Sequence, residues 1–235
     1  MALRTTSKEQ FIGTYESTAT SYDTRRSTTF EGRVVDERQI SLLRRLIKKS
    51  NAKKICEAGC GTGRIMVPLS KLDIECHGFD PSKNMLKQLK DKKPGKNVHL
   101  KTGDIEKIPY KANTFDLTYT MHVLMHLPDH KKAFNEMYRI TKPGGLVVCD
   151  FPNKNSIWTK LSILLSPSTP RTRLFTKKEL TEFFKDHKFQ VTGIFSYART
   201  FYKIPILRHL VYWLERNLPL PVSWRTQLIF IVRKT

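Results

Sequence analysis

Short apolar runs alternate along the chain with segments in which apolar residues recur at helical spacing. This alternation is typical of a parallel sheet with helices on both faces, so it predicts an α/β fold. Two late runs, 189–197 and 227–233, predict strands, and residues 31–49 predict a helix with one apolar face before the first strand. The strands predicted in the central part are 53–58, 74–80, 98–102, 115–120 and 145–151.

The two ends of the chain depart from this alternation. Residues 1–30 are rich in serine, threonine and charge with isolated aromatic residues, and two interpretations stay open for them, a mobile segment or a lid. Nearer the other end, Thr176 is followed three residues later by Glu179. This spacing is that of a capping box, and it predicts a helix over 176–187.

The net charge is the unusual feature of the composition. Lysine and arginine number 42 against 21 aspartate and glutamate, which gives +21. A positive field favours anionic partners such as nucleic acid, lipid headgroups or phosphorylated substrates, and a basic solvated surface is an equal alternative. Between Asp150 and Glu179 the chain has six basic residues and no acidic one, which favours the functional interpretation.

Other bulk features predict a cytoplasmic protein. No apolar run reaches the ~18 residues that a membrane-spanning helix needs, and the first residues lack the apolar segment of a secretory signal. The cysteines lie in or beside apolar runs and have no zinc-ligand spacing. We therefore expect small buried side chains in a reducing compartment at Cys56, Cys60, Cys76 and Cys149.

The first predicted strand ends in residues 57–64, EAGCGTGR. Closely spaced glycines let the chain turn sharply with positive φ and let a ligand lie against the backbone at the start of the next helix. A dinucleotide fingerprint has the spacing GxGxxG, whereas this segment is GxGxG with Arg64 at the place of the third glycine. Glu57 would repel a pyrophosphate, but its carboxylate suits the ammonium group of an amino-acid moiety.

Three more segments follow in order along the chain. Residues 78–82 read GFDPS, residues 103–105 read GDI, and residues 136–145 read EMYRITKPGG. Each acid taken singly could be a surface, cap or turn residue. Glu57, Asp80 and Asp104 together stand at the tips of three consecutive predicted strands, where ligands of open α/β sheets bind. On these segments the chain resembles the class I S-adenosylmethionine-dependent methyltransferases, in particular the small-molecule branch of ubiquinone/menaquinone-type methyltransferases.

This resemblance implies a Rossmann-like sheet of seven strands in the order 3-2-1-4-5-7-6, with strand 7 antiparallel. It implies S-adenosyl-L-methionine as cofactor and S-adenosyl-L-homocysteine as product, with Glu57 at the amino acid, Asp80 at the ribose and Asp104 at the adenine. Aspartate is commoner than Glu57 at its position, and we expect the one-methylene change to be tolerated. The expected cofactor-binding residues are Glu57, Gly59, Cys60, Gly61, Asp80, Pro81, Ser82, Met85, Asp104, Ile105, Thr120 and Met121.

The same resemblance implies a role for each part of the chain. We expect one domain over residues 1–235. In it, residues 1–50 form an N-terminal lid and helix, residues 51–151 form the cofactor-binding core, and residues 152–235 form the acceptor-side half.

Methyl transfer from a sulfonium is an in-line displacement, so a general base is needed only if the acceptor must lose a proton. The resemblance places the acceptor beside the end of the fourth strand. The candidate catalytic residues are therefore His122 and His126, with Tyr22, which resembles a lid tyrosine of many relatives; a structural role for His126 and Tyr22 stays equally open. His122, His126 and His130 have the spacing of a metal site, but no carboxylate or cysteine joins them and Pro128 interrupts the helix, so no metal is expected.

Two amphipathic segments, 156–166 and 205–217, bear on the acceptor, and the second lies in an insertion at 198–226. Their apolar faces indicate a small lipophilic acceptor or a peripheral contact with an anionic membrane, while simple packing over the sheet is the alternative. A rival function is RNA methylation, which the charge permits although no RNA-binding module is recognisable. A non-catalytic cofactor-binding protein is a third class, and the sequence carries no signal for an oligomeric state.

Overall fold

A computed structural model of the chain describes residues 7–27, 29–165, 172–194 and 221–235 and the single positions 207, 209, 210, 212, 213 and 217. Its strands are β1 Lys54–Ala58, β2 Glu75–Asp80, β3 Val98–Thr102, β4 Phe115–Thr120, β5 Thr141–Pro152, β6 Lys188–Ile194 and β7 Gln227–Arg233. They form one sheet in the order β3-β2-β1-β4-β5-β7-β6. The strands β1 to β5 pair in parallel, and β7 runs antiparallel between β5 and β6, so the predicted topology is confirmed.

The largest difference from the predicted strands is at the start of β5. This strand begins at Thr141, before the apolar run that predicted it at 145. Gly144 donates its N–H to the Lys234 carbonyl at 2.8 Å, and Lys234 donates back to the Gly145 carbonyl at 2.9 Å. These hydrogen bonds extend the pairing at this end of β5 through Gly144 and Gly145. Glycines carry no hydrophobic side chain, so the apolar pattern does not predict this part of the strand.

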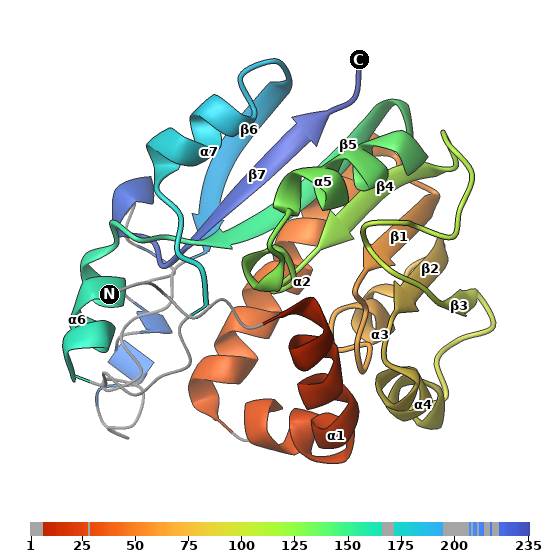
Figure 1. The fold of residues 1–235 in the computed structure, drawn as a ribbon, viewed down its shortest axis with the longest axis horizontal. Coiled ribbons are helices and arrows are strands. Elements are labelled where there is room, and N and C mark those ends of the chain that lie inside the picture. Colours follow the sequence, from red (N-terminus) through yellow and green to blue (C-terminus); the bar gives the residue numbers. More distant parts are fainter. Residues whose placement is uncertain are drawn as a thin grey trace.

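Helices cover both faces of the sheet (Figure 1). On one face lie α2 Phe30–Ser50, α3 Met66–Leu69 and α4 Lys83–Asp91, and on the other lie α5 His130–Ile140 and α7 Lys177–Phe183. The capping box of α7 is confirmed, because the Thr176 hydroxyl accepts from the Glu179 N–H at 3.1 Å and the Glu179 carboxylate accepts from the Thr176 N–H at 3.4 Å.

Each face of the sheet carries its own hydrophobic core. Phe79 and Phe115 pack with the residues of α5 and α7, whereas Ile55 and Tyr119 pack with those of α2, α3 and α4. Successive strand residues point to opposite faces, so a strand covered on both sides needs apolar residues at nearly every position. The cysteines are free and buried within these cores, as predicted.

Two segments flank the sheet at the end where β1 and β2 stop. The serine- and threonine-rich N-terminal segment forms the helix α1 Lys8–Ser27, which Figure 1 shows beside α3 and α4. After β5 the chain forms α6 Ile157–Leu165. Of the predicted helix 205–217 only single positions are described; residues 198–206 of the insertion and residues 195–197 of the predicted strand lie outside the described part. No helix in the described part is long and apolar enough to cross a bilayer.

Candidate functional site

A cleft lies between α1 and the loops that follow β1, β2, β3 and β4. Its empty space is about 970 Å³ when the solvent at its mouth is included. Every predicted cofactor-binding residue except Thr120 lines this cleft, and so do the predicted catalytic residues His122, His126 and Tyr22. Open α/β sheets bind ligands at this edge.

Thr120 has a different place. Its side chain is fully buried, and its hydroxyl donates to the Ala58 carbonyl at 2.8 Å. The bond ties β4 to β1 below the cleft, so we assign Thr120 to holding the two strands together. Its neighbour Met121 does line the cleft, because successive strand residues point to opposite sides.

The glycine segment turns tightly around the end of β1. Gly59, Gly61 and Gly63 have φ values of 76°, 50° and 76°, a region that residues with a side chain rarely adopt. A Cβ on Gly59 would lie 2.6 Å from Val123 Cγ2, whereas one on Gly61 would meet no atom within 4 Å. The backbone at Gly61 therefore leaves open space beside the cleft, where a ligand can lie against it.

Glu57 is a buried carboxylate facing this cleft. It is 4% exposed, and its Oε2 accepts from the Tyr119 hydroxyl at 3.1 Å. Burial raises the pKa of Glu57 to about 8, against the opposing effects of Arg64 and the Tyr119 bond. A ligand ammonium group would supply the positive charge that an ionised carboxylate needs at this depth.

Asp80 ends β2 and holds the glycine segment in place. Its Oδ2 accepts from the Gly61 N–H at 2.8 Å, and its Oδ1 accepts from the Ser82 N–H at 2.9 Å. Each carboxylate oxygen has a second lone pair, which is free to accept from a ligand hydroxyl. Burial raises the pKa of Asp80 to about 6 even though both backbone bonds favour the charged form.

Asp104, after β3, is held by the lid. Lys8 at the start of α1 contacts Asp104 Oδ2 and Glu106 Oε2, each at 2.6 Å. Partial burial opposes ionisation, but the hydrogen bond from Lys8 holds the pKa of Asp104 below its ordinary value. The carboxylate predicted to contact an adenine amino group is thus also the anchor of α1.

His126 lies in the short helix η1 Leu124–His126, against the aromatic residues of α1. Its Nε2 is 3.1 Å from the Tyr15 hydroxyl, its ring is 4.6 Å from the Phe11 ring, and Tyr15 in turn meets Tyr22 edge-on. Burial lowers the pKa of His126 to about 4, so the imidazole is neutral at pH 7. Its Nδ1 is buried and has no hydrogen-bond partner among the described residues.

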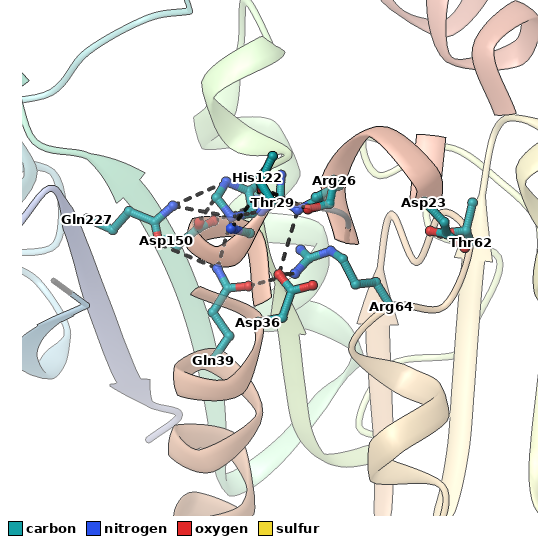
Figure 2. A network of polar contacts seen from close by, with 11 residues as sticks. Asp23, Arg26, Thr29, Asp36, Gln39, Thr62, Arg64, His122, Asp150 and Gln227 are labelled. Atoms are coloured by element: carbon teal, nitrogen blue, oxygen red, sulfur yellow. Dashed lines mark hydrogen bonds and ion pairs between the residues drawn. The ribbon is translucent and has the colours of Figure 1, made fainter. Parts of the chain in front are cut away.

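His122 lies at the centre of a polar network (Figure 2). Its backbone has φ +62°, and its N–H donates to Asp150 Oδ1 at 2.7 Å. Its ring Nε2 is 2.9 Å from an Arg26 guanidinium nitrogen and 3.0 Å from the Gln39 amide nitrogen. Burial and the charges of Arg26 and Arg64 hold the pKa of His122 well below its ordinary value, so this ring is also uncharged.

Further contacts fasten α1 over the cleft. Glu16 accepts from Ser82 Oγ and from the Asn84 N–H at the start of α4. Nearer the end of α1, the Thr62 hydroxyl donates to Asp23 Oδ1 at 2.6 Å. The N-terminal segment is thus a helix held against the cleft, and a role as a lid stays a prediction.

Sequence reasoning missed several residues of the site, chiefly Lys8, Tyr15, Arg26 and Arg64. Arg64 lines the cleft and pairs with Asp36 of α2. Charged residues in a Ser- and Thr-rich segment look like solvated surface, so no local pattern marks Lys8 or Arg26. The one available signal was Arg64 itself, at a position where a dinucleotide fingerprint would have glycine.

Comparisons with known proteins agree with this geometry. Residues 56–149 match a family model described as a methyltransferase domain. Demethylmenaquinone methyltransferase of Staphylococcus aureus (strain JH9) is 34% identical over 154 residues, 63% of this chain and 63% of that protein. The chain thus spans less than two thirds of the length of this curated relative.

Solved structures share the fold. Magnesium protoporphyrin IX methyltransferase of Synechocystis PCC 6803, with bound S-adenosylhomocysteine, superposes with a TM-score of 0.67 at 14% identity, covering 95% of this chain and 99% of that one. Phosphoethanolamine N-methyltransferase 2 of Haemonchus contortus, with S-adenosylmethionine, gives 0.56 at 18% identity, covering 77% and 48%. These low identities show the fold alone.

Residues 56–149 thus match a methyltransferase domain, and the order of the sheet is the one expected for the class I S-adenosylmethionine-dependent methyltransferases. Within that class, the chain is similar to the menaquinone-type methyltransferases.

Proposed function

We propose that the chain transfers the methyl group of S-adenosylmethionine to a small lipophilic acceptor by in-line displacement. The observation that carries this proposal is the cleft under α1. Carboxylates at the ends of three neighbouring strands line it together with two histidines that burial keeps uncharged. A donor that carries an ammonium group, a ribose and an adenine offers one partner to each of the three acids. The acceptor can then lie beside the two histidines.

The chain's acids would hold the donor by its polar groups. Glu57 pairs with the α-ammonium, the free lone pairs of Asp80 accept from the ribose hydroxyls, and Asp104 accepts from the adenine amino group. Met85 and Ile105 line the cleft with apolar surface beside these acids. When bound, the donor supplies an electrophilic methyl group, and the closed lid excludes water from it.

Three residues would serve the acceptor. His122 is the general base when the acceptor must lose a proton, because its ring is uncharged and therefore able to take one. His126, bonded to the Tyr15 hydroxyl, orients the acceptor, and Tyr22 closes the wall of the cleft. In this proposal residues 1–50 act as lid and helix, residues 51–151 hold the donor and residues 152–235 serve the acceptor.

The apolar character of the cleft supports a lipophilic acceptor. Phe11, Ile12, Val123 and Leu127 line it on the side of His126 and the lid. The curated relative acts, by its name, on demethylmenaquinone. An aromatic or quinone-like ring fits such a lining better than a polar nucleotide does.

The decisive experiment uses the purified chain with methyl-labelled S-adenosylmethionine and, separately, lipid extract and total RNA from cells that lack the gene. We expect label in the lipid extract and a species heavier by one CH2 in its mass spectrum. Asp80→Ala should abolish the transfer at low donor concentration, and Thr181→Ala, an exposed position on α7, should not. Label in the RNA and none in the lipid would refute a lipophilic acceptor in favour of the nucleic-acid alternative.

We further propose a peripheral contact with an anionic membrane. Among the described residues, the exposed large apolar side chains all lie after residue 156: Ile157, Ile163, Leu164, Leu210, Trp213 and Trp224. Trp224 lies at the start of α6, because the Ser156 hydroxyl donates to its carbonyl at 2.9 Å. Exposed Lys154 and Lys160 add positive charge to the same surface.

This contact predicts cosedimentation with vesicles that contain anionic lipid and fading of the binding as salt rises. Leu164→Glu should weaken the binding strongly, because that side chain is 75% exposed and would otherwise enter the lipid boundary. Thr181→Glu makes a similar charge change on α7 and should have the smaller effect. Equal binding by the two variants would refute the assignment of this surface.

A further inference from the structure

We propose that Arg26, His122 and Asp150 form one relay that activates a weakly acidic hydroxyl of the acceptor. In this relay Asp150 positions the imidazole of His122. Arg26 donates a hydrogen bond to Nε2 of that imidazole until the acceptor hydroxyl replaces it there. The inference rests on the proposed function and deepens it, since it names the chemical class of the acceptor. It also gives α1 a task besides covering the donor.

Asp150 holds His122 by two contacts. Its Oδ1 accepts from the His122 backbone N–H at 2.7 Å, and its Oδ2 lies 3.7 Å from the ring Nδ1. That Oδ2 is buried and has no hydrogen-bond partner among the described residues. The backbone bond supports the left-handed conformation of His122, which a residue with a side chain rarely adopts without such support. Asp150 is 1% exposed, so water cannot readily hydrogen-bond to its Oδ2. A small rotation of the imidazole would bring the Nδ1–H within hydrogen-bond distance of this oxygen.

Arg26 determines which ring nitrogen can act as the base. A guanidinium only donates hydrogen bonds, so the Nε2 that it contacts at 2.9 Å must accept. The amide nitrogen of Gln39, at 3.0 Å, also faces Nε2, whereas that of Gln227 lies 3.2 Å from both ring nitrogens (Figure 2). The ring proton is therefore on Nδ1, directed to Asp150, and the lone pair is on Nε2. This is the tautomer that a carboxylate-oriented base requires.

The charged groups around His122 keep it a neutral base. Arg26 faces it from α1, and Arg64 approaches from the glycine segment; both arginines share Asp36 of α2. His126 of η1 is a further titratable neighbour, and Asp150 is the acid from β5. The two arginines carry two positive charges and Asp36 carries one negative charge, so a net positive charge remains beside Nε2. This charge stabilises an acceptor oxygen that becomes negative.

The proton transfer balances without any other reactant. The acceptor O–H bond breaks, its proton goes to Nε2, and the electron pair stays on the acceptor oxygen, which Arg26 holds by an N–H. The imidazolium is stabilised by Asp150. The oxygen, or a ring carbon made electron-rich by it, forms a bond to the methyl carbon while the carbon–sulfur bond breaks and its pair goes to sulfur. When a ring carbon takes the methyl group, that carbon loses its hydrogen as a proton and the oxygen regains one, so one proton is released in either case. The imidazolium then returns its proton to solvent. The acceptor class is thus a phenol or enol.

The relay can be tested without any acceptor. Ring nitrogen NMR of the full chain with S-adenosylhomocysteine should show His122 as the Nδ1–H tautomer, neutral throughout the neutral range. Arg26→Met removes the cation at Nε2 and should raise the pKa of His122 toward its ordinary ~6.5. The control is Arg25→Met, the same change at an exposed neighbour on α1, which should leave the titration as in the unaltered chain. An Nε2–H tautomer, or the same titration in both variants, would overturn the relay.

A second arm uses the labelled lipid-extract assay. Asp150→Asn should lower kcat about 10- to 100-fold with little change in KM for the donor, because positioning a base acts on the proton-transfer step. Asp129→Asn makes the same change at the cap of α5 and should keep the activity. Equal activity of both variants would overturn the role of Asp150. Absence of transfer by the unaltered chain would overturn the proposed function instead, while the ring titration would still decide the relay.

Discussion

Binding of the donor should release a proton from Glu57. Burial raises the pKa of this carboxyl to about 8, so at pH 7 about 0.9 of the molecules carry its proton. A ligand ammonium group stabilises the carboxylate and lowers its pKa. If the pKa in the complex falls to about 6 or below, binding at pH 7 releases about 0.8 proton or more. The donor's own amino group, with an ordinary pKa of ~7.7–8.0, takes up a small fraction in the opposite direction.

Isothermal titration calorimetry in two buffers measures this release. At pH 7 the binding heat should be more exothermic in Tris than in phosphate, because a released proton binds to Tris with a large favourable enthalpy. The difference divided by the difference in buffer ionisation enthalpies gives the number of protons. Glu57→Gln copies the protonated form in size and polarity, so its heat should keep only the small buffer dependence of opposite sign that the donor's amino group causes. The same heat in both buffers for the unaltered chain, or equal buffer dependence in the variant, would refute the role of Glu57.

Three further predictions concern binding and stability. Asp80→Ala should weaken donor binding by about 1–3 kcal/mol in calorimetry, because it removes acceptors for ribose hydroxyls; unchanged affinity would contradict that assignment. Lys8→Met removes both ion pairs at the start of α1, so S-adenosylhomocysteine should leave about 2- to 5-fold faster in stopped-flow measurements, and an unchanged rate would argue against a lid at that end. Burial raises the pKa of Asp150 to about 6 and of Glu57 to about 8, so the stability they contribute is complete below their unfolded values and is lost as pH rises through the folded ones. The melting temperature of the donor-free chain should therefore fall between pH 5 and 8.5, and less so in Glu57→Gln.

The sequence predicted the sheet well because its signals are local. A strand buried on both faces is apolar at nearly every interior position, so a run such as Gln227–Arg233 marks its own limits. The glycine turn and the acids at strand ends are also local, since each follows directly from where a strand stops. Gly61 and Asp80 could be placed beside each other from the fold class alone, and they share a hydrogen bond of 2.8 Å.

The helix α1 and its place beside the cleft could not be predicted because its stability is not local. Helix α1 has no apolar stripe, and it is held by single polar pairs with distant segments, such as Lys8 with Asp104. The same holds for the contacts of His122, because Arg26 lies 96 residues before it in the sequence and Asp150 lies 28 residues after it. Thr120, unlike its neighbour Met121, does not line the cleft, because the sequence does not say which side of a strand tip faces it.

The attachment of α1 has a kinetic consequence. With 20 residues the helix is about 30 Å long, and it is fastened near its start by Lys8, in its middle by Glu16 and near its end by Asp23. A helix held at three points along its length must break these contacts and move away before a ligand can enter or leave the cleft. Substrates should thus bind in a compulsory order, the donor before the acceptor, and the spent donor should depart last. Turnover would then be timed by the opening of this helix rather than by the chemistry it covers.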